Sequence, residues 1–263
     1  MQKTRLTKLA ALTTLACVAA GVSVALAANV VKKEEITVTF NGGISPRKLP
    51  RTGTAPVGVQ MGGKIKSSND ASPPVLERIV LDINRNGVLQ TQGLPRCSLG
   101  KLKNATSAGA RRSCGDALVG RGSVTSRVSL PDQGAFASNG ALLAFNGRYK
   151  GHSAVFAQVS SGAPLPLTYV IVFEVKKGKG TFGTSLVGTL PEIASSYGYI
   201  TAFNLSLRRT YHFHGKRLSY ASAGCPAPKG FSSANFALAK VGYQFEDGRK
   251  VSATLIRQCK VRG

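Results

Sequence analysis

Two kinds of residue that can do chemistry lie close together between Tyr211 and Pro228, in the stretch YHFHGKRLSYASAGCPAP. His212 and His214 are two residues apart, which places both imidazoles on one face of a β-strand, and Cys225 follows eleven residues after His214. Imidazoles bind metal ions, and a cysteine acts as a nucleophile or forms a disulfide. The stretch therefore raises three hypotheses: a metal site, a cysteine enzyme and a structural disulfide.

The metal hypothesis needs a third ligand, and His152 is the only other histidine in the chain. The candidate metal ligands are therefore His152, His212 and His214. Basic residues flank the pair and would repel a cation: these are Arg208, Lys216 and Arg217. The scarcity of ligands and the neighbouring cations favour a solvated strand face over a metal site, and we predict no cofactor.

The cysteine count favours disulfides over a nucleophile. Cys17 lies in the N-terminal segment, so four cysteines remain: Cys97, Cys114, Cys225 and Cys259. Four cysteines in an exported chain indicate two disulfides, with three possible pairings. The most local pairing joins Cys97 to Cys114 and Cys225 to Cys259.

One enzyme family has a related arrangement around Cys225. The order His214-Gly215 followed by Ser222-Ala223-Gly224-Cys225 is similar to the signature of L,D-transpeptidases, exported cysteine enzymes that crosslink peptidoglycan. The family has a histidine where this chain has Ala223, and Pro226 follows where the family has an apolar residue. A disulfide partner for Cys225 would also remove the thiolate that this chemistry needs.

The N-terminal segment predicts export. Residues 1–27 combine a basic start (Lys3, Arg5, Lys8) with an apolar run and end in Ala25-Leu26-Ala27, which is typical of a cleaved secretory signal. A retained membrane anchor is the alternative, because the run approaches the ~20 residues that span a bilayer. We expect cleavage after residue 27, no membrane span in the mature chain, and a secreted or envelope-associated bacterial protein.

Charge is the strongest feature of the composition. The formal charge is +24, and removal of the three basic signal residues leaves +21 on residues 28–263. Such a charge attracts anionic cell-wall or extracellular polymers. The chain has no Trp and 7% aromatic residues, which disfavours specific nucleic-acid binding because few rings can stack on bases. Six basic residues are the candidate anion-binding set: Lys176, Lys177, Lys179, Arg208, Lys216 and Arg217.

Alternating hydrophobicity predicts an all-β fold. Segments such as ITVTF (36–40), LTYVIVFEVK (167–176) and KVSATLIRQCKV (250–261) have the period of two that half-buried strands show. About eleven strands separated by Gly, Pro and Asn predict an antiparallel β-sandwich or partly closed barrel. One short helix is expected within 98–112, with Ser98 as its N-cap.

We expect residues 28–263 to form a single β-rich domain. The alternative is a boundary near Cys97, which would separate an N-terminal β subdomain (28–95) from a C-terminal β domain (96–263). Four segments, CGDALVGRGSV, LLAFNG, YITAFNLSL and SYASAGCPAP, resemble a group of uncharacterised exported bacterial β-rich proteins. The resemblance implies export and one continuous β-rich unit, and it implies no activity.

No catalytic residues are predicted, because the sequence has neither a G-x-S-x-G elbow nor a phosphate-binding glycine motif that opens a helix. The favoured hypothesis is an exported, non-enzymatic β-sandwich protein that binds anionic envelope polymers or a protein partner. The alternative is an envelope-polymer hydrolase or metal-dependent enzyme with a site near His212 and His214.

Overall fold

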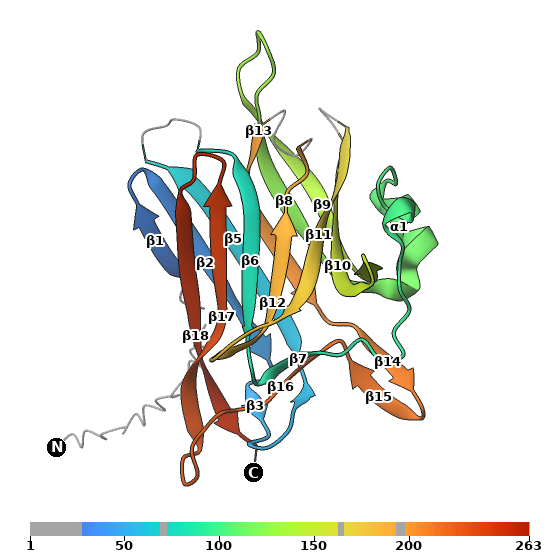
Figure 1. Cartoon of the computed structure of the whole chain (residues 1–263), viewed down its shortest axis with the longest axis vertical. Coiled ribbons are helices and arrows are strands. Elements are labelled where there is room, and N and C mark those ends of the chain that lie inside the picture. Colours follow the sequence, from blue (N-terminus) through green and yellow to red (C-terminus); the bar gives the residue numbers. More distant parts are fainter. Residues whose placement is uncertain (1–27, 69–72, 163–165, 193–197, 263) are drawn as a thin grey trace, which may run out of the picture.

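One large curled sheet dominates the computed structural model, which describes residues 28–68, 73–162, 166–192 and 198–262. The expected signal segment, 1–27, lies outside these described residues. The sheet has 13 strands in the order β1-β2-β5-β13-β8-β9-β10-β11-β12-β6-β17-β18-β3 (Figure 1). Their bounds are β1 (Asn29–Lys33), β2 (Ile36–Ser45), β3 (Lys48–Leu49), β5 (Gly58–Ser67), β6 (Leu76–Asn84), β8 (Leu118–Val128), β9 (Phe136–Tyr149), β10 (His152–Ser161), β11 (Leu167–Lys177), β12 (Phe182–Thr189), β13 (Gly198–Leu207), β17 (Ser233–Phe245) and β18 (Lys250–Val261).

The strands form because apolar residues alternate with polar ones. In β2, Ile36, Val38 and Phe40 are almost fully buried, while the threonines between them are partly exposed and point to the opposite face. All neighbouring strands of the sheet run antiparallel except β3, which pairs with β18 in parallel. The expectation of an all-β fold is confirmed.

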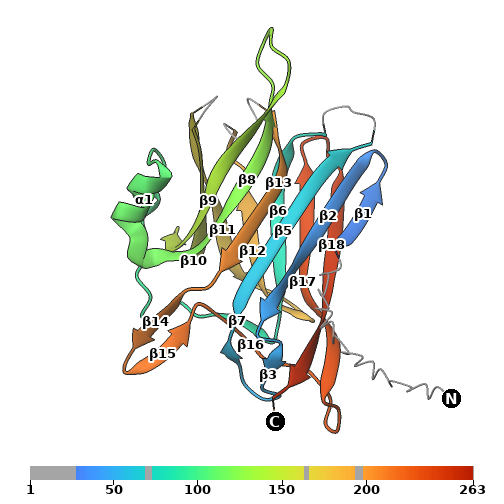
Figure 2. The same ribbon diagram turned by 180° about the vertical axis from the view of Figure 1, so that it is seen from behind.

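The sheet curls until β18 lies beside β1 and β2 at the other edge of the sheet (Figure 2). Arg257 of β18 donates a hydrogen bond from Nε to the Gly42 carbonyl of β2 at 2.7 Å. Lys33, at the end of β1, donates from Nζ to the Lys250 carbonyl at 3.3 Å. The result is a half-barrel whose concave face encloses much of the apolar core.

Because long antiparallel strands alternate in direction, the turns fall at two opposite ends of the sheet. The basal end is the end at which β2, β6, β9, β11, β13 and β18 finish. It is the lower end in Figure 1. The opposite end is the apical end. Two small sheets lie near the basal end: β4 (Ala55–Pro56), β16 (Ala221–Ala223) and β7 (Gly87–Leu89) form one, and β14 (Thr210–Phe213) pairs with β15 (Lys216–Ser219) in the other.

A short helical segment covers the convex side of β9 and β10 (Figure 1). It contains η1 (Leu99–Lys101), α1 (Ser107–Cys114) and η2 (Gly115–Ala117). The predicted cap is wrong: Ser98 precedes only the 3-10 turn and makes no capping bond. Thr106 caps α1 instead, accepting a hydrogen bond at its Oγ1 from the Gly109 amide at 3.2 Å.

The predicted number of strands is also wrong, because the described residues form strands β1 to β18. The additional strands have two to five residues, too few for an alternating pattern to stand out. In addition, the alternating stretch YITAFNLSLRRTYHF (199–213), which the sequence predicts as one strand, is divided at Arg208 and Arg209 into β13 and β14.

Candidate functional site

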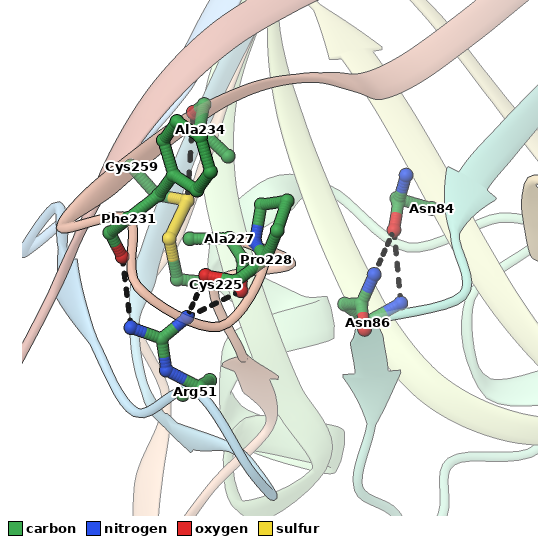
Figure 3. Close-up of a disulfide and its surroundings, with 9 residues drawn as sticks. All are labelled: Arg51, Asn84, Asn86, Cys225, Ala227, Pro228, Phe231, Ala234 and Cys259. Carbon is green, nitrogen blue, oxygen red and sulfur yellow. Dashed lines mark hydrogen bonds between the residues drawn. A yellow bond between two sulfur atoms is a disulfide. The ribbon is translucent and has the colours of Figure 1, made fainter.

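Four cysteines form two disulfides, Cys97–Cys114 and Cys225–Cys259. This is the most local pairing. Figure 3 shows the second bridge beside Arg51, whose guanidinium donates from Nη1 to the Ala227 carbonyl at 2.6 Å and from Nη2 to the Phe231 carbonyl at 2.8 Å. Since Cys225 is bonded to Cys259 and 1% exposed, it offers no thiolate for transpeptidase chemistry.

The two histidines do not share a strand face, contrary to the sequence prediction. β14 ends at Phe213, and His214 with Gly215 forms the turn into β15, with φ values of 47° and 72°. A two-residue turn with positive φ at both positions is the usual connection of a β-hairpin. His212, His214 and His152 are all exposed. Among the described residues, no group of three or more His, Cys, Asp or Glu side chains is placed to hold a metal ion.

The β14–β15 hairpin is anchored through its apolar side rather than through the histidines. Tyr211 is buried and donates from its hydroxyl to the Gln92 carbonyl at 2.8 Å. The Phe213 ring lies over Gly93, where any Cβ atom would overlap the ring, and Gly93 has a φ of 73°. The hairpin therefore depends on a glycine at this position.

We expect Gly93→Ala to lower the free energy of unfolding by about 2 kcal/mol, because alanine is strained at positive φ and its methyl group displaces Phe213. Urea unfolding measures the loss, and hydrogen exchange should show it first in the β14–β15 amides. Gly100→Ala is the matched control, since a Cβ at Gly100 meets no atom within 4 Å. Equal stabilities for the two variants would contradict this account of the hairpin.

The predicted anion-binding residues fall at one end of the molecule. Lys177 and Lys179 lie at the β11–β12 turn, Arg208 follows β13, and Lys216 and Arg217 begin β15. Lys176 is one residue further up β11 and pairs with Glu174 at 3.4 Å. We define the basal cations as the exposed basic side chains at or next to the basal turns: Arg47, Lys48, Arg51, Arg85, Lys150, Lys177, Lys179, Arg208, Lys216, Arg217, Lys229, Lys260 and Arg262.

The acidic residues gather at the opposite end. Seven of the eleven acids in the chain lie in or beside apical turns: Glu34, Glu35, Glu77, Asp132, Glu192, Glu246 and Asp247. Within the described part of the chain, Asp82, Asp116 and Glu174 are the acids that lie toward the basal end. Asp82 already accepts a hydrogen bond from the Ser185 hydroxyl. The two ends of the sheet therefore differ strongly in charge.

The surroundings of two arginines show the same difference between the ends. At the apical end, Arg249 contacts Asp247 at 2.6 Å and Glu34 at 3.6 Å, and its guanidinium lowers the pKa of the Asp247 carboxyl. Toward the basal end, partial burial, followed by repulsion from Arg47, lowers the pKa of Arg257. Like charges are thus close enough at the basal end to act on one another.

A second candidate site is a cavity of about 190 Å³ on the concave side of the half-barrel. Its walls come from most strands of the large sheet, and β7 and β16 line its basal part. Small residues at inward positions leave this space unfilled, among them Gly43, Gly63, Ala144 and Ala157. The polar side chains in the lining belong to Gln60, Tyr220, Ser222 and Tyr243. The cavity was not predicted from the sequence.

Comparisons with models of protein families, with curated proteins and with solved structures found no match. The geometry of this chain therefore carries the functional argument alone. Over the residues that the structure describes, no helix has the length and apolar character needed to cross a membrane.

Proposed function

We propose that this protein is exported and binds an anionic polymer of the cell envelope or its surroundings through the basal cations, without catalysing a reaction. The observation that carries the proposal is the separation of charge along the sheet. A field of one sign at one end attracts a polyanion and orients the protein on it. A charge of +21 spread evenly would attract the same polymer without orienting the protein.

Several contacts support a binding role for the basal end. The basal cations lie on turns and strand ends, where side chains reach away from the sheet. The β11–β12 turn is fixed against β6 by the hydrogen bond from the Arg85 amide to the Thr181 carbonyl, at 2.9 Å. Arg51 similarly holds the loop that carries Lys229. Fixed cations lose less conformational entropy on binding than free ones.

Export is supported by the two disulfides, since such bonds persist in oxidising compartments outside the cytoplasm. An acidic polymer bound to a pattern of exposed cations is held by salt-sensitive contacts. Each exposed pair contributes about 0.2–1 kcal/mol, so useful affinity requires many pairs at once. A long polyanion that spans several basal turns meets this requirement better than a small anion.

The test is retention of residues 28–263 on immobilised dextran sulfate and on purified cell-wall polymer. We expect binding at low ionic strength that is lost at roughly a few hundred millimolar salt. Reversing four basal charges (Lys177→Glu, Lys179→Glu, Lys216→Glu, Arg217→Glu) should weaken binding at least about tenfold.

The matched control distinguishes the effect of where the basic residues lie from the effect of the total charge. Lys32→Glu, Lys64→Glu, Lys66→Glu and Lys250→Glu change the net charge equally, but they lie on strands or turns away from the basal end. We expect this variant to keep most of its affinity. Equal losses in the two variants, or no retention of the wild type at low salt, would refute the proposal. Binding of a protein but of no polymer would favour a protein partner instead.

A further inference from the structure

The cavity on the concave side of the half-barrel is large enough for a small organic molecule. Engineered cavities of about 150 Å³ lined by Leu, Ile and Phe stay free of water and bind benzene. The cavity of this protein is about 190 Å³, and its lining includes Leu81, Phe173 and Leu205. By this comparison it has room for a compound of about one or two fused rings.

A single polar group without a partner lies in the cavity wall. Tyr243 of β17 is 2% exposed, and no hydrogen-bond partner is found for its hydroxyl. Buried tyrosine hydroxyls usually have a partner, and leaving one unpaired costs about 1–3 kcal/mol. Burial also raises the pKa of Tyr243 well above its ordinary value, so the phenol stays neutral and can donate as well as accept a hydrogen bond.

The Tyr243 hydroxyl and the Phe203 ring can both lie against β5 because residue 63 is a glycine. The Tyr243 oxygen would lie 3.1 Å from a Cβ atom at Gly63 of β5, and that Cβ would also lie 2.6 Å from the Phe203 ring. Strands β17 and β5 are not neighbours in the sheet, so the hydroxyl reaches from one wall of the half-barrel to another. Any side chain at residue 63 would displace the Phe203 ring and crowd the Tyr243 hydroxyl.

A lone water is a poor occupant for this site. Buried waters typically make about three hydrogen bonds to protein groups, whereas the side chains around Tyr243 in the cavity, including Phe40, Phe203 and Leu255, are apolar. A molecule that fills the apolar volume and presents one oxygen to Tyr243 would fit the apolar walls and also give the Tyr243 hydroxyl a hydrogen-bond partner.

We propose that the half-barrel binds a compact, largely apolar molecule of one or two rings that carries a single hydrogen-bonding oxygen, with that oxygen paired to the Tyr243 hydroxyl. This site is separate from the basal cations, and binding at one does not require the other.

Toluene and p-cresol are suitable probes because they differ by one hydroxyl group. Isothermal titration calorimetry and the shift of the melting temperature should both report saturable binding of each probe to residues 28–263. Tyr243→Phe should weaken p-cresol binding at least about fivefold, because the cresol hydroxyl is then buried without a partner, and change toluene binding less than about twofold. Tyr169→Phe is the control, since Tyr169 is also buried but does not line this cavity.

A second variant tests the volume rather than the hydroxyl. Ala157→Leu places a larger side chain in the cavity and should reduce binding of both probes in a protein whose circular dichroism is unchanged. If neither probe binds the wild type, the cavity has no such ligand and the proposal fails. It fails equally if Tyr243→Phe weakens toluene and p-cresol to the same degree, because the hydroxyl is then not the anchor.

Discussion

Replacing Cys225 and Cys259 together with alanine is expected to lower the free energy of unfolding by about 4 kcal/mol, from the loop-closure entropy returned to the unfolded chain. The two residues are 34 apart in sequence and almost fully buried, at 1% and 0% exposure. Alanine introduces no polar group at these positions, so the change reports the crosslink and the small volume lost. Urea unfolding under non-reducing conditions measures it.

The other disulfide provides the comparison. Cys97 and Cys114 close a loop of only 17 residues, for which the same entropy argument gives about 3 kcal/mol. The Cys225–Cys259 variant should therefore be the less stable of the two. The Arg51 contacts to Ala227 and Phe231 remain in it, so loop 226–231 should stay attached. A larger loss from removing Cys97–Cys114 would show that local packing, not loop length, determines these stabilities.

Long strands were predictable from the sequence because their pattern repeats enough times to be recognised. The β17–β18 hairpin is an example: its strands alternate, and the Asp-Gly pair between them, Asp247-Gly248, is a common hairpin turn signal, with Gly248 at a φ of 83°. Short strands such as β4 and β16 gave no such signal. Their pairing depends on backbone groups brought together from distant parts of the chain, as when Ser222 pairs with Val88.

The prediction that His212 and His214 share one strand face is wrong for a local reason. Alternation predicts one strand through Arg208 and Arg209 to His214, but His214-Gly215 is itself a turn signal of the X-Gly type. A strand that ends at Phe213 and a hairpin that buries Tyr211 were both within reach of the sequence. The end of β13 at Leu207 could not be predicted from the sequence, because it depends on where the paired strands β5 and β8 begin.

The charge separation could have been found from the sequence. In a chain of long antiparallel strands, successive turns alternate between the two ends. The acidic turns near Glu34 and Asp247 then fall on one side, and the basic turns near Lys150 and Lys179 fall on the other. The cavity could not have been found in this way. Its key contact, Tyr243 opposite Gly63, requires knowing how far the sheet curls.

Truncation of Phe156 to alanine is expected to lower the free energy of unfolding by about 3–5 kcal/mol, comparable to or larger than the loss of either disulfide. Phe156 is 0% exposed and packs with Leu102, Leu143 and Phe145 between the sheet and the helical segment. Its ring also covers Gly147, so no side chain is available to fill the space that the ring leaves.

The direction in which Phe156 points gives this prediction a second measurable consequence. Its neighbours Val155 and Ala157 line the cavity, and alternation along β10 places Phe156 on the other face, under α1. Phe156→Ala should therefore destabilise the protein in urea while leaving toluene binding to the folded state within about twofold.

Phe231→Ala is the control, because this ring is 64% exposed and its loss should change stability by less than about 0.5 kcal/mol. A Phe156→Ala protein as stable as the control would mean that the helical segment adds little to the fold. Lost toluene binding in a folded Phe156→Ala protein would mean that the two faces of the sheet are coupled, and that the cavity depends on the helix that covers its outer wall.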